Sequence, residues 1–364
     1  MAKKIFIAAT MQNDGKTTVS LGLIAAFKKR FERVGFIKPI GQRYLIEQGY
    51  KVDEDSVLIE EVFGIKCNIK DMSPIAIEKG FTERFIEKGP DENYAKLIVE
   101  AYEHVANDND LVIIEGTGHA GVGSVFDLSN ASVAKLLDAN VVLISSGGIG
   151  KPIDEFSLNK ALFDREGVNL AGVVVNKVLP EKYDKIARFV RKGLERKGMN
   201  VLGILPYQHV LDIPTIREVM EEIKLDPLHK DVDFDQTAER ILIGAMNVKD
   251  ALPILQPRSM VIVPGDRDDM IKAICNLHMG KMKRTCAISG IILCGGLAPK
   301  HSTQSLLKRS KIPVLTTKED TYAIAARVNS MTVKLKPQDS DKIKIIVDMI
   351  EKYVDIDKVL AKLK

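Results

Sequence analysis

The chain has 364 residues and a formal net charge of only +4 at pH 7, with 45% hydrophobic and 28% charged residues. This is the composition of an ordinary globular protein, and because one hydrophobic core stops growing at roughly 250–300 residues, we expect two domains. The charges are balanced along the whole chain and no apolar run reaches about 20 residues, which argues against nucleic-acid and membrane partners and favours a cytoplasmic protein.

Short apolar runs alternate with amphipathic stretches through the first half of the chain. We expect strands at residues 4–9, 34–40, 111–115, 141–145, 171–175 and 201–205, and helices at 17–31, 91–107, 154–165 and 181–197. The first apolar run is short and leads into a charged Gly-Lys-Thr loop, so it is a strand and not a signal peptide. Strands that are apolar on both faces and alternate with helices are typical of an α/β fold, with a parallel sheet covered by helices on both sides.

A second α/β series follows Pro206. We expect strands at 240–243, 259–263, 287–294 and 313–316, and helices at 215–222, 248–255, 268–276, 303–310 and 322–330. The boundary is placed near residue 208, which divides the chain into domains 1–207 and 208–364. The Lys-rich tail at 339–363 is expected to be helical and to belong to the smaller second domain.

The segment between the first strand and the first helix, residues 9–18, has the sequence Ala-Thr-Met-Gln-Asn-Asp-Gly-Lys-Thr-Thr. The N–H groups of a tight turn and of a helix N-terminus form a cradle for phosphate. Lys16 can reach the β- and γ-phosphates of a nucleotide, and the Thr17 hydroxyl can bind Mg²⁺. The alternative is a glycine-capped loop with a solvated lysine. We predict binding of ATP and Mg²⁺, with nucleotide contacts from Thr10, Asn13, Asp14, Gly15, Lys16, Thr17 and Thr18.

A second Gly-Lys pair lies in the glycine-rich residues 145–151, also after an expected strand. Pro152 stands where a serine or threonine would bind Mg²⁺, so we expect a loop that lines the cleft and not a second nucleotide site. The four cysteines show no CxxC spacing and the histidines show no paired spacing, so we expect reduced thiols and no metal site built from these residue types.

Acidic residues follow two of the expected strands. Glu115 ends an apolar strand and precedes Gly-Thr-Gly, at the edge of a parallel sheet where ligands bind. We predict that it binds Mg²⁺, with an ordinary salt bridge as the alternative. Asp53 and Asp55 lie beyond the second strand. Asp55 could supply a further Mg²⁺ ligand, whereas Asp53 either does the same or only caps the next helix.

Lys38 closes the second strand, because Pro39 ends the strand and restricts the residue before it. This places the Lys38 ammonium at the cleft, available to an anionic substrate or a phosphate, unless it is an ordinary surface lysine. We predict a catalytic set of Lys16, Lys38 and Glu115.

Together these features resemble the dethiobiotin synthetase-like group of P-loop proteins over residues 1–207. The resemblance rests on Thr10 in place of the first glycine of GxxxxGK[ST], on Lys38-Pro39, on the Glu-Gly-Thr-Gly loop at 115–118, and on Gly-Ile-Leu-Pro at 203–206. It implies a P-loop NTPase-type sheet, contact between Asn176 and the adenine, and a homodimer formed across the nucleotide cleft. His119 stands where the enzyme of that group has glycine, which argues against diaminopelargonate as the substrate.

The second half resembles the DRTGG domain, through Val-Pro-Gly-Asp-Arg-Asp-Asp at 263–269 and Ile-Ile-Leu-Cys-Gly-Gly at 291–296. The acids of the first segment are expected to cap the following helix, and the paired glycines to admit an anion or a nucleotide. The two domains together resemble the N-terminal portion of long phosphotransacetylases. The chain ends at Lys364 without a transacetylase catalytic domain, so we expect no acetyl phosphate chemistry.

Two functions remain open. In the first, Mg-ATP phosphorylates a small carboxylate or carbamate, with Lys16, Thr17, Asp55 and Glu115 organising charge around the γ-phosphate and Lys38 holding the acid. His119 is then either an acid/base group, a substrate contact or incidental. In the second, the chain is a regulatory or scaffold protein in which the DRTGG domain senses a ligand and reports bound ATP to a partner. We take the enzyme as the first hypothesis.

Overall fold

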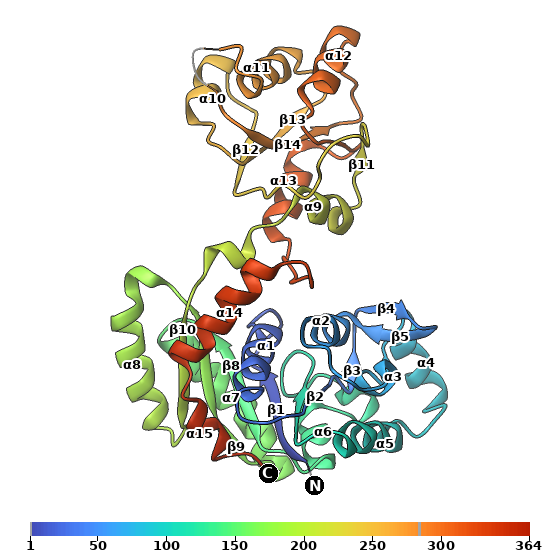
Figure 1. Ribbon diagram of the computed structural model, residues 1–364, viewed down its shortest axis with the longest axis vertical. Helices are drawn as coiled ribbons and strands as arrows, with labels where there is room; N and C mark the ends of the chain where they lie inside the picture. Colours follow the sequence, from blue (N-terminus) through green and yellow to red (C-terminus); the bar gives the residue numbers. More distant parts are fainter. Residues whose placement is uncertain (1, 283–284) are drawn as a thin grey trace. The chain divides into compact units, whose positions relative to one another are not determined.

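The structure is a computed structural model that describes residues 2–282 and 285–364, and the chain divides into two compact units (Figure 1). Unit 1 comprises Met1–Gln208 and Leu335–Lys364, and unit 2 comprises His209–Lys334. Unit 2 is therefore an insertion in the chain of unit 1. No helix in the described residues is long and apolar enough to cross a membrane.

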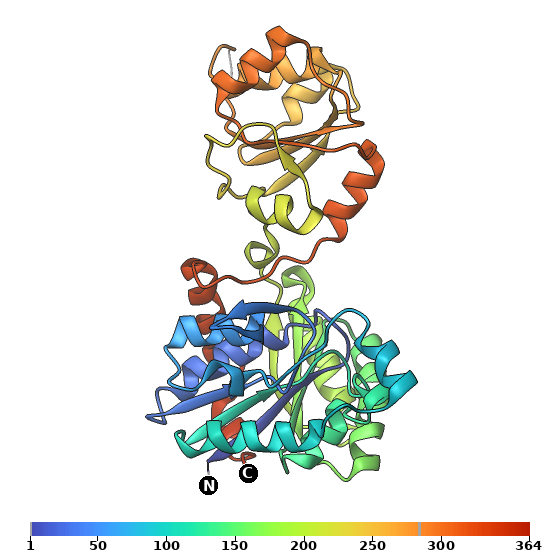
Figure 2. The same ribbon diagram turned by 90° about the vertical axis from the view of Figure 1, so that its right-hand side faces the viewer.

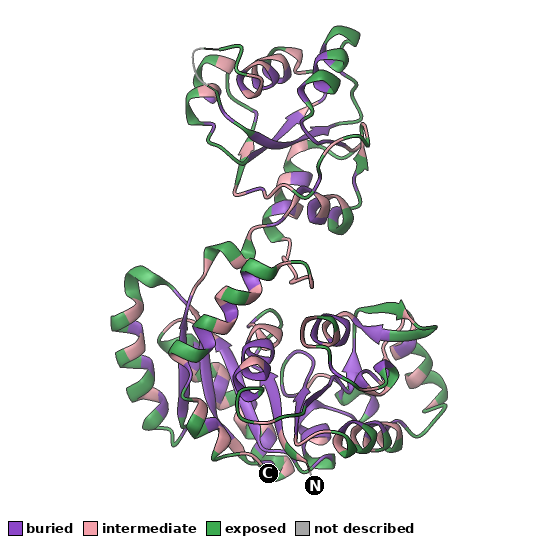
Figure 3. Ribbon diagram, in the orientation of Figure 1, coloured by how far each residue is buried: buried purple, intermediate pink, exposed green. Residues whose placement is uncertain are grey.

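Unit 1 is built on a six-stranded parallel sheet in the order β10-β9-β8-β1-β7-β2. The strands are β1 (Lys3–Ala9), β2 (Val34–Ile37), β7 (Leu111–Glu115), β8 (Val141–Ser146), β9 (Leu170–Val178) and β10 (Val201–Pro206). Their residues are almost all buried, as the purple strands in Figure 3 show. The expected parallel sheet is confirmed, and its order brings the carboxyl ends of β1, β7 and β8 together.

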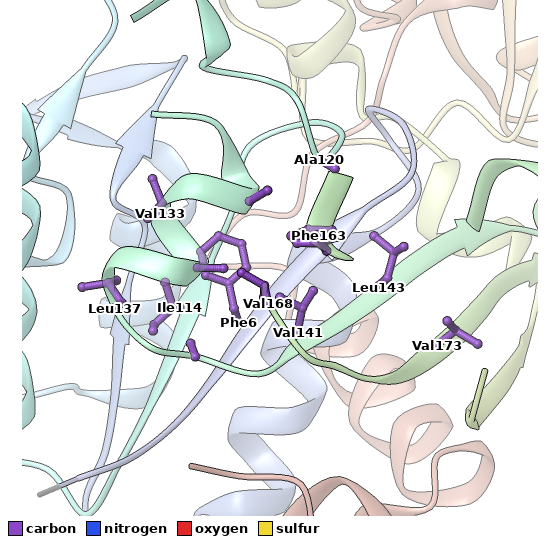
Figure 4. Packing of buried hydrophobic residues seen from close by; sticks show 14 of the residues in the cluster. Phe6, Ile114, Ala120, Val133, Leu137, Val141, Leu143, Phe163, Val168 and Val173 are labelled. Carbon is purple, nitrogen blue, oxygen red and sulfur yellow. The ribbon is translucent and has the colours of Figure 1, made fainter. Parts of the chain in front are cut away.

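Helices cover both faces of this sheet. The core in Figure 4 lies on one face, where Phe6, Ile114 and Leu143 pack with Val133 and Phe163 of the covering helices. The helices of the first unit are α1 (Lys16–Phe27), α2 (Glu54–Phe63), α3 (Ile69–Met72), α4 (Phe81–Lys88), α5 (Tyr94–Asn107), α6 (Asn130–Leu136), α7 (Gly150–Glu166) and α8 (Tyr183–Glu195), with 3-10 turns η1 (Ser124–Phe126) and η2 (Pro180–Lys182). Two small ribbons, β3 (Ile40–Gly41) with β6 (Ile75–Ala76) and the hairpin β4 (Tyr44–Glu47) with β5 (Tyr50–Asp53), follow the second strand. The sequence patterns had not indicated them.

The C-terminal tail packs on unit 1, which differs from the expected domain 208–364. It forms α14 (Ser340–Tyr353) and α15 (Ile356–Leu360), and α14 contacts both α1 and β10. The Asp355 N–H donates to the Leu202 carbonyl at 2.8 Å, and the Lys4 N–H donates to the Lys364 carbonyl at 2.9 Å. The two ends of the chain consequently lie side by side (Figures 1 and 2). Amphipathic periodicity predicted these helices, but it does not identify which core covers their apolar face.

The contact between α1 and α14 is close enough to require a glycine. A Cβ atom at Gly22 would lie 2.2 Å from Ile350 Cγ1. Alanine favours a helix by about 1 kcal/mol over glycine, but inserting an extra carbon into a packed contact costs about 1–3 kcal/mol. We therefore expect Gly22→Ala to lower the free energy of unfolding, measured by urea denaturation. Gly150→Ala, where no atom lies within 4 Å, is the matched control and should not destabilise the protein. A stabilised Gly22→Ala variant would contradict this packing.

Unit 2 has a five-stranded sheet in the order β11-β15-β14-β13-β12. Its strands β12 (Arg240–Ile243), β13 (Ser259–Pro264), β14 (Ile288–Cys294) and β15 (Val314–Thr316) are parallel, and the short β11 (Asp226–Pro227) is antiparallel. Alternate residues of β13 enter two different hydrophobic clusters, one on each face, so helices cover this sheet on both sides. The helices are α9 (Ile216–Ile223), α10 (Val248–Ile254), α11 (Asp268–His278), α12 (His301–Ser310) and α13 (Thr321–Ser330), preceded by the 3-10 turn η3 (His209–Asp212).

Candidate functional site

The loop between β1 and α1 is held by the side chain of Asp14, which is buried. The Met11 N–H and the Thr10 hydroxyl each donate to Asp14 Oδ2 at 2.8 Å, and the Ser146 hydroxyl donates to Oδ1. Gly15 has a positive φ of 96°, and a Cβ there would lie 2.2 Å from the Asn176 amide nitrogen. The carboxylate of Asp14 therefore points into the loop and holds its backbone in place by hydrogen bonds.

Thr10 occupies the position of the first glycine of the common motif, and its hydroxyl links the loop to α7. The hydroxyl lies 3.0 Å from Glu155 Oε2, which also accepts a hydrogen bond from Ser145 at 2.8 Å. Sequence reasoning missed Ser145, Ser146 and Glu155 as partners of this loop. Glu155 could have been suspected only from its place one turn after Lys151, with which it forms an exposed ion pair.

Asn176 lies at the carboxyl end of β9 and contacts the same loop. Its amide N–H donates to the Asp14 carbonyl at 2.9 Å, and its oxygen accepts from the Lys177 N–H at 2.8 Å. The side chain is buried. Asn176 thus braces the loop between β1 and α1, and its contact with an adenine ring stays a prediction.

Lys38 is buried among carboxylates, with only 7% of its surface exposed. Its ammonium is 2.9 Å from Asp53 Oδ1 and 3.7 Å from Glu115 Oε1, and it is ion-paired with Asp55. The sequence predicted an ammonium that is available to an anionic substrate, whereas the structure buries it and pairs it with three carboxylates. The reason is the β4–β5 hairpin, which returns the chain to the end of β2 and brings both aspartates onto the lysine. The catalytic role of Lys38 stays a prediction.

The two aspartates have different roles in this cluster. Asp53 caps α2, because its Oδ1 accepts the Asp55 N–H at 3.0 Å, which decides in favour of the capping alternative. Asp55 lies beside Thr17, whose hydroxyl donates to Glu115 Oε1 at 3.1 Å. Thr17, Asp55 and Glu115 therefore meet, as the sequence predicted, and Asp53 is directed toward Lys38 and the helix cap.

Burial and charge shift the pKa values of this cluster in different directions. Burial alone would lower the pKa of Lys38, but the attraction of Asp55, Asp53 and Glu115 outweighs it and raises that pKa. Burial raises the pKa of Glu115 from 4.5 to about 7, and the nearby Asp55 adds to the shift. Burial also lowers the pKa of Lys16, against the opposing attraction of Glu115. Three carboxyl groups, those of Asp53, Asp55 and Glu115, are thus ion-paired with the single ammonium of Lys38. The cluster therefore favours the binding of an additional positive charge.

The donor set fits Mg²⁺ bound together with phosphate. Glu115 is completely buried, and within the described residues its Oε2 accepts no hydrogen bond of good geometry, although the Ser20 hydroxyl lies near this carboxylate. The Thr17 hydroxyl donates to the other oxygen, Oε1. In the described residues no group of three or more His, Cys, Asp or Glu is placed to hold a metal by itself. Mg²⁺ at nucleotide sites takes one or two carboxylates and completes its shell with phosphate oxygens and water. Thr17, Glu115 and Asp55 are the residues that would hold it.

The raised pKa of Glu115 predicts a stability that depends on pH. Between about pH 4.5 and pH 7 the folded protein keeps the Glu115 proton that the unfolded chain releases, so the free energy of unfolding falls as the pH rises. The fall attributable to this group is at most about 1.4 kcal/mol per pH unit. We expect Glu115→Gln to remove it, as measured by urea denaturation of the ligand-free protein across this range. A difference between wild type and variant that does not change with pH would contradict the assignment.

A pocket of about 130 Å³ adjoins the Gly-Thr-Gly segment after Glu115. Asn130, at the start of α6, shapes this segment by accepting the Thr117 N–H at 3.0 Å and donating to the carbonyls of Thr117 and His119 at 2.7 Å. His119 is exposed, and its Nδ1 accepts the Gly121 N–H at 3.1 Å. The imidazole therefore stabilises the loop in which it lies by an internal hydrogen bond.

In unit 2 the motif residues after β13 are used locally. Arg267 donates to the Gly244 and Met246 carbonyls and pairs with Asp269. Asp268 and Asp269 lie in the first turn of α11, where the sequence placed acids, and Asp268 also accepts the Lys300 N–H at 3.0 Å. The N–H groups of the paired glycines 295 and 296 donate to the carbonyls of residues 319 and 317. They are therefore not directed at an anion.

Comparison with known proteins gives two family matches. A family model described as an AAA domain matches residues 3–215, and one described as a DRTGG domain matches residues 218–331. This confirms the predicted order of a P-loop domain and a DRTGG domain.

The curated relatives are phosphate acetyltransferases. The enzyme of Pseudomonas putida is 27% identical over 370 residues, which cover 96% of this chain and 50% of that protein. The enzyme of Synechocystis is 25% identical over 375 residues, covering 100% of this chain and 52% of that protein. The chain thus spans about half the length of these relatives. Among solved structures, a plasmid partition protein of Borrelia burgdorferi bound to AMPPNP is 14% identical, with a TM-score of 0.38 over 58% of this chain and 89% of that chain.

Proposed function

The chain belongs to the AAA domain family, whose model matches residues 3–215, and from this premise we propose that unit 1 binds Mg-ATP and transfers the γ-phosphate to a small carboxylate or carbamate. One observation carries the proposal. Within the described residues, one oxygen of the buried Glu115 carboxylate accepts no hydrogen bond of good geometry, and the other accepts the Thr17 hydroxyl. Thr17 lies in the first turn of the helix that opens with Lys16. A helix N-terminus, a lysine and an oxygen site for Mg²⁺ together suit a nucleotide triphosphate.

The chain's own residues account for most of such a reaction, because phosphoryl transfer depends on positioning and charge neutralisation. Lys16 and the N–H groups at the start of α1 would hold the β- and γ-phosphates, and bound Mg²⁺ would neutralise charge on their oxygens. A carboxylate oxygen of the co-substrate attacks the γ-phosphorus, and the bond from that phosphorus to the β,γ-bridging oxygen breaks. The products are ADP and an acyl phosphate. Lys38 acts here as a positioning residue that keeps Asp55 and Glu115 in place.

Trapping with hydroxylamine tests this activity, because hydroxylamine converts an acyl phosphate into a stable hydroxamate. We expect ADP and hydroxamate to form in equal amounts when Mg-ATP and a suitable monocarboxylate are supplied. Glu115→Gln should abolish both products. ATP binding without ADP formation for any acid in a broad panel of small carboxylates and carbamates would contradict the enzyme hypothesis.

A regulatory function is the second candidate, and the path of the chain favours it. The chain leaves unit 1 after Gln208, forms unit 2 and returns at Leu335, shortly before α14. Because α14 packs on α1, the helix that follows the phosphate-binding loop contacts the segment that emerges from unit 2. ATP occupancy that changes ligand binding by unit 2, with no ADP formed, would support this function. The homodimer predicted from the family resemblance is a further proposal, to be checked by light scattering with and without Mg-AMPPNP.

A further inference from the structure

The pocket beside the Gly-Thr-Gly segment is separate from the phosphate-binding loop but adjoins it. Two of its lining residues, Ile40 and Thr117, lie two positions after Lys38 and Glu115. Two residues of extended chain span roughly 7 Å, the length of about five single bonds. A third lining residue, Gln42, accepts a hydrogen bond at 3.3 Å from Gln12 of the phosphate-binding loop. A single small molecule can therefore reach both the pocket and the cluster around Glu115.

Among the residues that the structure describes, no charged side chain lines this pocket. Its apolar wall consists of Ile40, Ile77, Val122, Val125 and Phe126. Moving an ion into such a site without a partner is unfavourable, so the pocket disfavours a charged group. The volume of about 130 Å³ is close to that of a cavity that accepts one benzene molecule, or about six non-hydrogen atoms.

The polar atoms of the lining are few, and most are already used. Thr117 donates its hydroxyl to the Ile40 carbonyl, and Asn130 is saturated by the loop that it braces. Thr82, at the start of α4, contributes a further hydroxyl. The amide of Gln42 is a further neutral polar group in the lining. The pocket therefore suits an aliphatic or aromatic tail, with neutral polar atoms only beside Thr82 and Gln42.

We propose that this pocket binds the uncharged tail of the co-substrate, which is then a monocarboxylic acid of about six carbons or more whose carboxylate lies toward Glu115 and the γ-phosphate. This inference rests on the proposed phosphoryl transfer and specifies its substrate class. Dicarboxylic acids and acids with an amine at the far end of the chain are disfavoured, because the described lining of the pocket has no charged partner for a second charge.

Three acids of equal chain length test the proposal on the full chain. They are hexanoate, adipate, which carries a second carboxylate at the tail, and aminohexanoate with the amine at the far end. Binding is measured by saturation-transfer NMR with Mg-AMPPNP present, and turnover is measured separately with ATP through ADP and hydroxamate. We expect hexanoate to bind roughly tenfold or more tightly than either charged-tail acid.

Two tryptophan variants locate the binding. Val125 lines the pocket on η1 and is 43% exposed, so Val125→Trp can fill the pocket and still fold. Ile86 on α4 is 68% exposed and does not line the pocket, which makes Ile86→Trp the matched control. Val125→Trp should weaken hexanoate binding by about tenfold or more, through lost apolar burial, and Ile86→Trp should not. Both variants should bind Mg-AMPPNP as the wild type does.

The outcomes separate this inference from the function on which it rests. Hexanoate that binds in the expected pattern without formation of ADP supports the pocket and contradicts phosphoryl transfer. Equal affinity for hexanoate and adipate overturns the inference, and so does a Val125→Trp variant with unchanged hexanoate affinity. Failure of hexanoate to bind the Mg-AMPPNP complex also overturns it, even if another acid supports turnover.

Discussion

Lys16→Ala is expected to weaken Mg-ATP binding by about 100-fold or more, equivalent to roughly 2.7 kcal/mol, because hydrogen bonds to charged groups are among the strongest in proteins. Lys16 is half-buried, and this burial lowers the pKa of its ammonium. Contact with phosphate oxygens therefore requires little further desolvation. Replacing a poorly hydrated cation with a methyl group should also leave the fold intact, so the loss of affinity can be assigned to the site. Fluorescence anisotropy with a labelled ATP analogue measures it.

Lys151→Ala is the matched control for this variant. Lys151 also follows a glycine at the start of a helix, but it is solvent-exposed and paired with Glu155 at 3.6 Å. Its removal should change the ATP affinity by less than about threefold, because exposed ion pairs contribute under about 1 kcal/mol. A larger effect at Lys151 than at Lys16 would place the phosphates at the second glycine-rich loop.

Lys38→Met is expected to destabilise the ligand-free protein by about 3–5 kcal/mol at pH 8, because it leaves buried carboxylates without their counter-charge. The pKa of Lys38 is raised by Asp55, Asp53 and Glu115 despite burial, so the ammonium is charged at every pH at which the protein is handled. In the variant these carboxyl groups hold their protons to higher pH. The destabilisation should therefore shrink toward pH 5 and grow as the pH rises.

Urea denaturation of wild type, Lys38→Met and Lys29→Met measures this effect at several pH values. Lys29 pairs with Glu351 at the surface, where 62% and 35% of the two side chains are exposed. Its replacement should cost less than about 1 kcal/mol, and the cost should not grow above pH 5. If Lys38→Met were as stable as wild type at pH 8, Lys38 would not be the counter-charge of this cluster.

The sequence predicted those parts of the site that depend only on which residues stand at the ends of strands. Lys16 and Thr17 follow a strand and open a helix, and Glu115 ends the neighbouring strand, so strand-end reasoning brought them together correctly. Lys38 was misplaced because its environment depends on the β4–β5 hairpin, whose short strands carry exposed apolar side chains and no clear alternation. The position of Lys38 at the end of its strand was predictable, but its burial by the later β4–β5 hairpin was not.

The domain organisation shows the same limit. Alternating strands and helices predicted both sheets, because each strand is buried by elements near it in sequence. The tail was different, since α14 packs on α1 more than 300 residues earlier in the chain. The apolar stripe of a helix indicates that this face is buried, but it does not identify the element that buries it. Similarly, nothing in the sequence connected Glu155 with Thr10, because their contact depends on the adjacency of β1 and β8.

Calorimetric titration of the full chain with ATP, with and without Mg²⁺, tests the central claim most directly. The account predicts saturable binding of one ATP per chain that tightens when Mg²⁺ is present, and it predicts that Glu115→Gln removes the gain from Mg²⁺ while weak Mg²⁺-free binding persists. Wild-type protein that binds no ATP in the presence of Mg²⁺ would contradict the account, because neither phosphoryl transfer nor nucleotide sensing could then be assigned to unit 1.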